Sequence, residues 1–369
     1  MIGIIWILVL LIVIPILVYN VYTSTAPQFG RKPNKVKLVK LAKTSSYVKG
    51  KFRNLTDVPV ILPKTYGKII RMQFRKSPHR VPETAIPSAK PVFNDSIPSD
   101  RFSVIWLGHS SVLIRISDLI ILTDPVFSKR ASPVSFVGPE SFKYTIPFSP
   151  ETIPFPDIIL ISHDHFDHLD YKTITNYYAH VKSFIVPLGV KSHLVRWGVP
   201  KENIIELDWG SEFGFSDGLK FIAAPAQHFT GRHGQDNSTL WCSWVIKEKS
   251  GSIYFSGDSG YSDHFKETGE KYGPFDLAFI ECGAYGKYWP YIHMVPEESA
   301  QAGLDVNAKV VLPIHWGKFN LAFHPWKEPV ERFSAEANKL GIQFVTPIPG
   351  QEIRADEDLP QDKWWQNIN

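Results

Sequence analysis

The sequence predicts an α/β fold in which two β-sheets pack together and helices cover the outside. Closely spaced segments of β-branched and large apolar residues begin at Phe102, which is typical of strands. Segments with a helical pattern alternate with the later strands. The chain of 369 residues is 44% hydrophobic and 13% aromatic, which is ample for a sizeable core. Because sheets and helices each bury one apolar face, this order favours a layered α/β architecture.

The elements follow one another from the first strand, and the early strands are separated by gaps the size of turns. Strands are expected at residues 102–107, 112–116, 119–122, 157–161, 183–186, 204–207, 219–223, 241–246, 252–255, 277–280 and 310–313. Helices are expected near residues 171–180, 190–197, 263–272, 296–304 and 329–340. The strand at 157–161 matters most, because it leads directly into a cluster of histidines and acids.

The N-terminus carries an almost unbroken apolar run from Ile2 to Val18, at the short end of what spans a bilayer. A cleaved signal peptide would begin with positive charge and end at a small-residue site. This start has no Lys or Arg, and the candidate site at Ala26 is followed at once by Pro27. We therefore expect a transmembrane anchor over residues 1–22. Because basic residues follow it, the positive-inside rule predicts a single-pass membrane protein with a cytoplasmic catalytic domain.

Charge is distributed unevenly, although the net charge is only +4. Residues 1–56 contain no acid, whereas Lys and Arg crowd residues 31–53. Such a segment attracts anionic lipid head groups, at about 1 kcal/mol for each basic residue near the surface. We expect no nucleic-acid partner, because no recognition motif accompanies the charge. Residues 23–100 are rich in proline and lysine, which indicates a basic linker and an N-terminal extension that packs on the core.

A metal site is predicted in the loop after the strand at 157–161. His163 and His165 stand two residues apart, so both can turn toward one cation in an extended loop, and Asp167 and His168 can reach a second. Imidazole nitrogens and carboxylate oxygens are the ligands that hold zinc-like cations. A solvated polar loop is the ordinary alternative. The ligand spacing favours the metal site.

Three later strand ends supply residues that could complete a site for two metals. They carry His228, Asp258 and His315. Asp258 lies between Gly257 and Gly260, where the backbone can approach a ligand closely. A lone histidine at a strand end is more often a hydrogen-bonded core residue. Together with the loop, these residues make seven candidate ligands at one edge of the sheets.

The chain resembles the metallo-β-lactamase superfamily, and within it the N-acyl-phosphatidylethanolamine-hydrolysing phospholipase D family. The matching segments include Trp106-Leu107-Gly108-His109, Gly257-Asp258-Ser259-Gly260-Tyr261 and Ile314-His315-Trp316-Gly317, and the similarity extends over residues 102–351. The resemblance implies an αββα sandwich. It gives a metallo-β-lactamase-fold hydrolase domain at residues 101–355, with a tail at 356–369.

By position, the resemblance implies two zinc ions, although the same ligands also suit manganese or iron. His163, His165 and His228 would hold the first ion. Asp167, His168 and His315 would hold the second. Asp258 would bridge the two, so that Asp167 and Asp258 count among the catalytic residues.

Further roles follow from the same resemblance. His293 matches a histidine near the family's active site, where it would bind phosphate or donate a proton, unless it is only a surface histidine beside a helix. His109 and Asp124 are expected to orient metal ligands or to be buried polar residues bonded to the backbone. Aromatic residues in 284–291 and 319–323 line an acyl channel or belong to the core.

The activity implied is hydrolysis of N-acyl-phosphatidylethanolamine to N-acylethanolamine and phosphatidic acid by a zinc-dependent, phospholipase D-type phosphodiesterase, through a metal-bridging hydroxide. The partners expected are a phospholipid substrate, the membrane and a second copy of the chain, since symmetric dimers are the commonest oligomers. A lactonase of the same fold acting on a soluble metabolite is the alternative. A non-catalytic metal-binding module is disfavoured, because all seven ligand positions hold competent residues.

Overall fold

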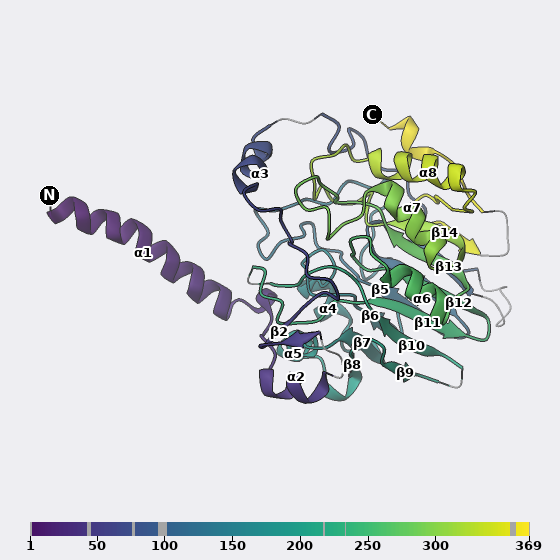
Figure 1. Ribbon diagram of the computed structural model, residues 1–369, viewed down its shortest axis with the longest axis horizontal. Helices are drawn as coiled ribbons and strands as arrows, with labels where there is room; N and C mark the ends of the chain where they lie inside the picture. Colours follow the sequence, from purple (N-terminus) through teal and green to yellow (C-terminus); the bar gives the residue numbers. More distant parts are fainter. Residues whose placement is uncertain are drawn as a thin grey trace.

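The computed structural model describes residues 2–42, 46–75, 78–94, 102–216, 218–232, 234–354 and 359–368, with side chains from Leu10 onward. Two sheets face each other in this part of the chain, and helices lie outside both (Figure 1). The predicted α/β fold is confirmed. The boundaries expected near residues 100 and 355 lie outside the described residues, so the division into domains stays a prediction.

The first sheet has seven strands among the described residues. Their order is β15 (Glu352–Arg354), β3 (Phe102–Trp106), β4 (Val112–Ile116), β5 (Leu119–Thr123), β6 (Ile158–Leu160), β7 (Ser183–Pro187) and β8 (Ile204–Leu207). Strands β5 to β8 run parallel, and the others pair antiparallel. Strand β6 is apolar throughout and buried, as expected of a central strand covered on both faces.

The second sheet has six strands among the described residues. Their order is β14 (Ala308–Ile314), β13 (Phe275–Glu281), β12 (Gly251–Phe255), β11 (Ser243–Glu248), β10 (Lys220–Ala224) and β9 (Glu212–Gly214). Strands β12 to β14 are parallel, and the rest pair antiparallel. The carboxyl ends of parallel strands meet at one edge of a sheet. The loops that follow β5, β6, β12 and β14 therefore lie close together.

The helices complete the two outer layers. Their bounds are α4 (Tyr171–Tyr177), α5 (Lys191–Arg196), α6 (His264–Tyr272), α7 (Pro296–Asp305) and α8 (Glu328–Leu340), with short 3-10 turns η2 (Lys201–Asn203) and η3 (Trp364–Asn367). One core cluster joins the facing sheets and extends under α7 and α8. A second cluster fills the space between the first sheet and the helices α4 and α5.

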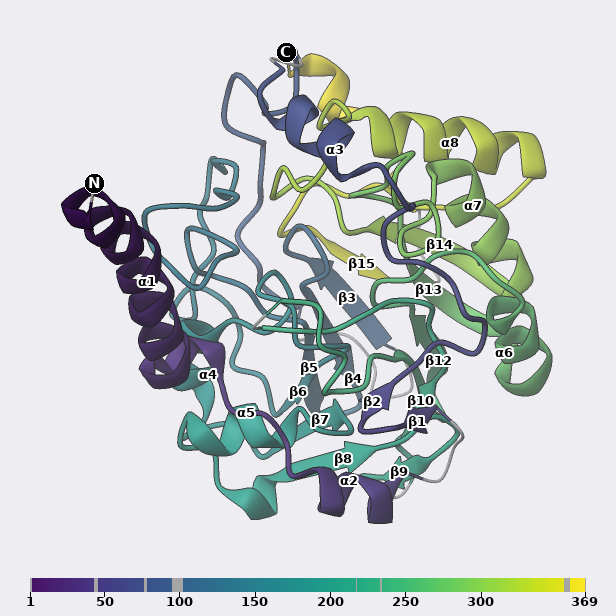
Figure 2. The same cartoon turned by 60° about the vertical axis from the view of Figure 1, so that its left-hand side comes forward.

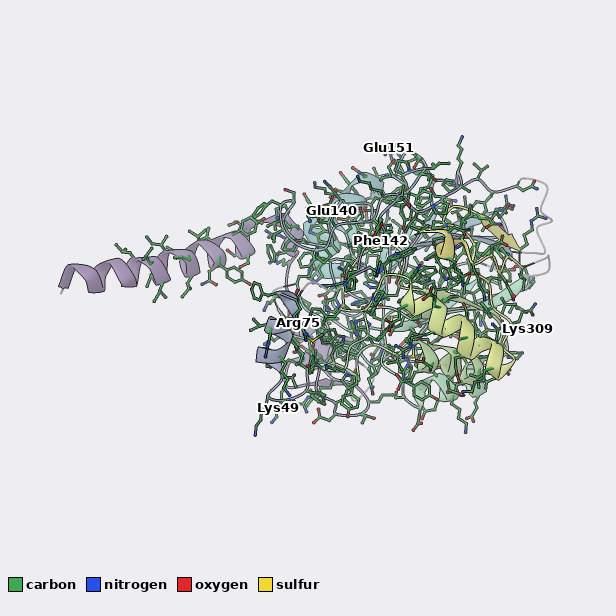
Figure 3. All side chains as sticks on the ribbon, turned by 90° about the horizontal axis from the view of Figure 1, so that it is seen from above. Lys49, Arg75, Glu140, Phe142, Glu151 and Lys309 are labelled. Carbon is green, nitrogen blue, oxygen red and sulfur yellow. The ribbon has the colours of Figure 1, made fainter. Side chains whose placement is uncertain are left out.

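The N-terminal region adds α1 (Ile2–Thr25), η1 (Pro27–Phe29), α2 (Lys35–Leu41), β1 (Tyr47–Val48), β2 (Lys51–Phe52) and α3 (Tyr66–Gln73). Helix α1 projects away from the body (Figures 1 and 3). Figures 1 and 2 place α2 beside β8, where Lys37 Nζ lies 3.4 Å from Glu206. Phe29, Leu38 and Phe52 are buried against the rest of the molecule.

The expected transmembrane anchor over residues 1–22 is wrong. In the part of the chain that the structure describes, no helix is both long and apolar enough to cross a membrane. Helix α1 contains Pro15, and polar Asn20, Thr23, Ser24 and Thr25 occupy its last turns. A membrane span needs about 20 predominantly apolar residues. The expected localisation as a single-pass membrane protein, which depends on this anchor, is therefore wrong as well.

Candidate metal centre

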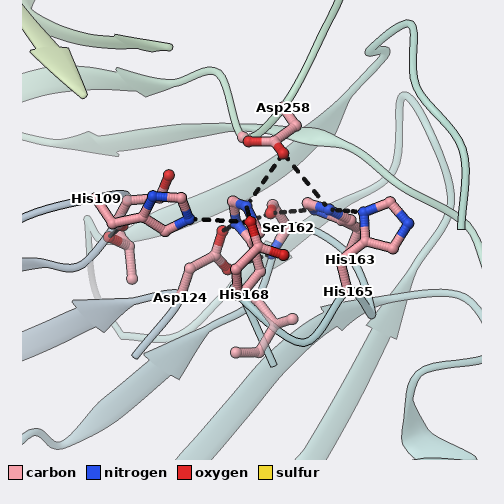
Figure 4. Close-up of polar contacts among 12 residues, drawn as sticks. His109, Asp124, Ser162, His163, His165, His168 and Asp258 are labelled. Atoms are coloured by element: carbon pink, nitrogen blue, oxygen red, sulfur yellow. Dashed lines mark hydrogen bonds and ion pairs between the residues drawn. The ribbon is translucent and has the colours of Figure 1, made fainter. Parts of the chain in front are cut away.

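Six strand ends bring the predicted site residues to one edge of the two sheets. The loop after β6 carries His163, His165, Asp167 and His168, and the other strand ends carry His109, Asp124, His228, Asp258 and His315. Figure 4 shows Asp258 facing the histidines of the β6 loop from the second sheet. The structure therefore gathers all seven predicted ligands, and it places their donor atoms in two adjoining clusters.

The first cluster consists of His163, His165, His228 and Asp258, whose donor atoms lie within 4.8 Å of one another. His165 Nδ1 is 2.9 Å from His163 Nε2 and 3.2 Å from His228 Nε2. Three imidazole nitrogens thus point at a common position. This is the set that the sequence predicts for one metal.

The second cluster consists of Asp167, His168 and His315, together with His109. Asp167 Oδ2 lies 3.4 Å from His168 Nε2 and 3.6 Å from His315 Nε2. His109 Nε2 is 3.1 Å from the same oxygen, so this histidine fixes the Asp167 carboxylate. The second predicted set is therefore also brought together, with His109 beside it.

Asp258 stands between the two clusters. Its Oδ2 is 3.8 Å from His163 Nε2 in the first cluster, and it is 3.1 Å from His168 Nε2 and 3.0 Å from His315 Nε2 in the second. The preceding Gly257 has φ 57°, and a Cβ there would meet Ser162 Cβ at 2.7 Å. Glycine is therefore needed at that position, because it lets β12 deliver Asp258 against the β6 loop.

Hydrogen bonds hold the ligand rings in place. Asp124 accepts from Ser162 N at 2.7 Å and from His168 Nδ1 at 2.7 Å, which leaves His168 Nε2 for the cluster. His228 Nδ1 donates to the carbonyl oxygen of Ile292 at 2.9 Å, so Nε2 is again the free nitrogen. Partners of this kind set the tautomer and the orientation of metal-binding histidines. The orienting role expected of Asp124 agrees with this geometry.

Backbone strain is concentrated at the same place. His109, Asp124 and His315 have φ values of 55°, 34° and 65°. Non-glycine residues in this region cost on the order of 1–3 kcal/mol each and persist where the surroundings enforce them. Their occurrence at three strand ends around one cluster is typical of a functional site.

The electrostatics suit ligands for cations. Burial lowers the pKa of His163 and His228 well below the ordinary value, so both are neutral imidazoles. Burial raises the pKa of Asp258, but the His168 and His315 imidazoles outweigh it and hold that pKa well below its usual range. Neutral imidazole and ionised carboxylate are the forms that bind metals.

Positive charge is favoured in the second cluster. Burial lowers the pKa of His315, yet the Asp258 and Asp167 carboxylates more than offset this and raise it to about 9. The same balance raises the pKa of His168 well above its usual value. The carboxylates therefore stabilise cationic charge at this position.

The donor set also fits divalent cations because several of its buried polar atoms have unmet hydrogen-bonding capacity. Among the described residues, His168 Nε2 and His315 Nε2 are buried and make no well-aligned hydrogen bond, although Asp258 Oδ2 lies 3.1 and 3.0 Å away. Asp258 Oδ1 is buried without a hydrogen-bond partner. Buried polar atoms without partners are costly. Metal ions would satisfy all of these atoms at once.

A cavity of about 270 Å³ opens onto the two clusters. His165, Asp167, Asp258, His293 and His315 form its polar side. Its apolar walls come from Val60, Ile61, Phe229, Ala284, Trp289, Ile292 and Leu321. Ala284, Trp289 and Leu321 belong to the two aromatic segments in which an acyl channel is expected, and His293 lines the cavity.

The N-terminal extension contributes to the site in a way that its sequence does not predict. Val60 and Ile61 line the cavity, and Leu62 N donates to the carbonyl oxygen of Tyr288 at 2.8 Å. Asn54 bonds both backbone groups of the predicted ligand His228, at 3.0 and 2.9 Å. The proline-rich and basic composition of this segment carries no signal for these contacts.

Comparison with known proteins agrees with the fold. The model of the beta-lactamase superfamily domain matches residues 120–316, more than half of the chain. An uncharacterised protein of Mycobacterium tuberculosis is 42% identical over 290 residues, covering 77% of each chain. The N-acyl-phosphatidylethanolamine-hydrolyzing phospholipase D 1 of Caenorhabditis elegans is 36% identical over 319 residues, covering 78% of this chain and 88% of its own.

A solved structure adds to the evidence for the fold. A metallo hydrolase of the archaeon Ignicoccus hospitalis superposes with a TM-score of 0.54 at 19% identity, covering 70% of this chain and 99% of its own. The fold and the family match together define a metal-dependent hydrolase that binds divalent metal. The chain belongs to the metallo-β-lactamase superfamily, as its sequence predicts.

Proposed function

We propose that this chain is a phospholipase D-type phosphodiesterase that hydrolyses N-acyl-phosphatidylethanolamine to N-acylethanolamine and phosphatidic acid. In this proposal His163, His165 and His228 hold one zinc ion, Asp167, His168 and His315 hold a second, and Asp258 contacts both. The similarity to the phospholipase D of Caenorhabditis elegans supports the lipid substrate.

The observation that carries the proposal is the cavity, which places apolar walls directly against the two clusters. Val60, Ile61 and Trp289 lie on the same cavity as Asp258 and His315. An amphiphile with a phosphodiester beside its apolar chains fits such a site, because its head group can reach the cluster while its chains cover the walls. A small polar lactone would leave these walls uncovered.

Bound zinc ions would supply the reaction with a water of lowered pKa and with positive charge for the phosphoryl oxygens. The chain's own residues provide the rest. Asp124 and the Ile292 carbonyl keep His168 and His228 oriented toward the cluster. The apolar walls lie beside the cluster, and His293 lines the same cavity, where the phosphate would lie. In the net reaction, water gives its hydroxyl to phosphorus and its proton to the departing N-acylethanolamine oxygen.

The test is release of N-acylethanolamine from N-acyl-phosphatidylethanolamine in mixed micelles by the zinc-loaded protein. The wild-type chain should release it, and His165→Ala and Asp258→Asn should not. His180→Ala and Asp118→Asn are matched controls, because both residues are exposed and neither lines the cavity. These two variants should keep the wild-type rate.

A soluble lactone is assayed in parallel with the phospholipid. Hydrolysis of the lactone alone by a protein that carries two metal ions would replace the phospholipase proposal with the lactonase. Equal activity in wild type and in Asp258→Asn would remove the cluster from the reaction.

A further inference from the structure

Helix α3 turns an apolar row toward solvent. Tyr66, Ile70 and Phe74, the residue that follows the helix, stand four residues apart, so their side chains lie along one side. They are 61%, 60% and 85% exposed. The structure describes all of α3, and no residue in it is buried. Figures 1 and 2 show the helix outside both sheets. Large apolar side chains that gather on the surface in this way mark a contact with another molecule.

Cationic side chains accompany the apolar row. The helical period places Lys68, Arg71 and Arg75 on the side of α3 next to it, and Lys64 lies just before the helix. All four are exposed. The sequence has no Asp or Glu from residue 58 to residue 82. This surface is therefore both apolar and positively charged, which is the composition of helices that lie on phospholipid surfaces.

The same segment forms a wall of the cavity. Val60 and Ile61 line the cavity beside the two clusters. Helix α3 begins five residues after Ile61, a path of at most about 18 Å even in a fully extended chain. Leu62 N donates to the Tyr288 carbonyl at 2.8 Å, and Thr65 Oγ1 donates to the Leu62 carbonyl at 2.6 Å. These bonds fix the connection, so the exposed row is held close to the cavity wall.

The proposed substrate points to the same kind of partner. N-acylation removes the ammonium charge of the ethanolamine head group, which leaves the phosphate as the only charge of the lipid. A surface that holds this lipid is therefore negatively charged, and it stays so when phosphatidic acid is formed. Each Lys or Arg near such a surface strengthens binding roughly fivefold. The cations of α3 match this charge.

We propose that α3 docks the chain on an anionic phospholipid surface, from which lipid passes along residues 60–65 into the cavity. Ile70 and Phe74 enter the lipid layer, and the neighbouring cations contact the phosphates. The passage of lipid into the cavity rests on the proposed function. Docking does not, because it involves no reaction.

Vesicle binding tests the docking without any reaction. The zinc-loaded full chain is mixed with vesicles of phosphatidylcholine and phosphatidylglycerol, and the bound fraction is measured by co-sedimentation. Wild type should bind. Ile70→Ser with Phe74→Ser should weaken binding by at least about tenfold, because two apolar side chains no longer enter the lipid. Phe155→Ser with Leu304→Ser is the matched control, since these side chains are 54% and 50% exposed elsewhere on the surface, and it should bind as wild type.

The charge of the surface is tested separately. Lys68→Gln, Arg71→Gln and Arg75→Gln together should weaken binding to the phosphatidylglycerol vesicles by about 100-fold, because three cations are lost. Binding to vesicles of phosphatidylcholine alone should not fall, since that lipid has no net charge. A control with the same loss of charge should bind within about twofold of wild type, because salt screens distant charges. It replaces by glutamine three exposed lysines in or near α6, namely Lys249, Lys266 and Lys271.

Hydrolysis shows whether docking serves the cavity. On N-acyl-phosphatidylethanolamine in vesicles, Ile70→Ser with Phe74→Ser should raise the apparent KM for bulk lipid by at least about tenfold, because less protein is on the surface. A short-chain phosphodiester dissolved as monomers needs no docking. Its hydrolysis should keep the wild-type rate, since the described lining of the cavity includes neither side chain.

Two results would overturn the docking role. The first is equal vesicle binding by wild type and by Ile70→Ser with Phe74→Ser; if this variant also dissociates a wild-type dimer in sedimentation velocity, the row is a contact between two copies. The second is an equal loss on vesicle lipid and on the dissolved phosphodiester, because the two side chains would then support the site itself. Failure of the proposed function looks different: wild type binds vesicles through α3 but releases no N-acylethanolamine, which removes the substrate and leaves the docking.

Discussion

Asp124 follows β5, yet it orients the imidazole ring of His168 in the loop after β6. Its carboxylate accepts from His168 Nδ1 and is completely buried. Asp124→Asn removes the charge that favours the Nδ1–H tautomer. We expect zinc affinity at the second cluster to fall by 10- to 100-fold, the usual effect of losing such a partner. Competition with a chelating dye measures it, with Asp118→Asn as the control. Unchanged affinity would show that Asp124 does not orient the ligand.

At this scale the sequence predicts which residues gather at the cluster better than it predicts the groups that support them. The spacing of His163, His165, Asp167 and His168 is local, so it can be read directly from the chain. The geometry gathers these residues with His228, Asp258 and His315 as expected. The Ile292 carbonyl has no such signal, because a backbone oxygen supports a ligand only when the fold places it beside the imidazole ring.

At the scale of elements, the segment after β2 holds the backbone of His228, a residue of the first cluster, in place. Asn54 bonds both backbone groups of His228 and also accepts from Trp241 Nε1 at 3.0 Å. Asn54→Ala would leave buried backbone groups without partners, at about 1–3 kcal/mol. We expect urea unfolding of the zinc-loaded protein to show this loss. Asn338→Ala, at an exposed position of α8, is the comparison and should leave stability unchanged. Equal stability of Asn54→Ala and wild type would contradict this role of Asn54.

Helix α6 provides a prediction for pH. His264 is buried at the start of this helix, and burial lowers its pKa to about 3. Below pH 6.5 the unfolded chain therefore takes up a proton that the folded chain does not, so stability falls as the pH falls. His264→Gln should reduce the loss of unfolding free energy between pH 7 and pH 5 by about 2 kcal/mol. Denaturant titrations at both values test this, and the exposed His180→Gln should change nothing.

Regular elements are predicted where apolar patterns are long, and missed where they are short. Strands β4 (Val112–Ile116) and β8 (Ile204–Leu207) begin and end as expected. The three-residue edge strands β9 (Glu212–Gly214) and β15 (Glu352–Arg354) were not expected, because they are too short to show alternation. Helices α2 and α3 were also missed, since their segment reads as a linker of lysines and prolines.

At the scale of the whole molecule, the two sheets meet at the cluster, and metal should therefore hold them together. Ligands in the loops after β10, β12 and β14 of one sheet face ligands from the β6 loop of the other. A ligand that binds only the folded state at a thousand times its Kd adds about 4 kcal/mol of stability. Chelation should therefore lower Tm, and added zinc should restore it. The double variant His165→Ala and His315→Ala should show no such response.

The N-terminal region shows where a pattern in sequence misleads at this scale. The apolar run predicts an anchor by composition, whereas the described helix is not long and apolar enough for one. The extension after it reaches the cavity through Val60 and Ile61, which composition did not indicate. The expected homodimer and the contact of the basic segment with lipid stay predictions.

The most direct measurement follows the oxygen of water during turnover. The zinc-loaded wild-type chain is incubated with N-acyl-phosphatidylethanolamine in ¹⁸O-labelled water, and the masses of both products are measured by mass spectrometry. We expect one label in phosphatidic acid and none in the N-acylethanolamine, because water attacks phosphorus and the ethanolamide oxygen leaves. Unlabelled phosphatidic acid, or no release of either product from a protein that carries two zinc ions, would contradict it.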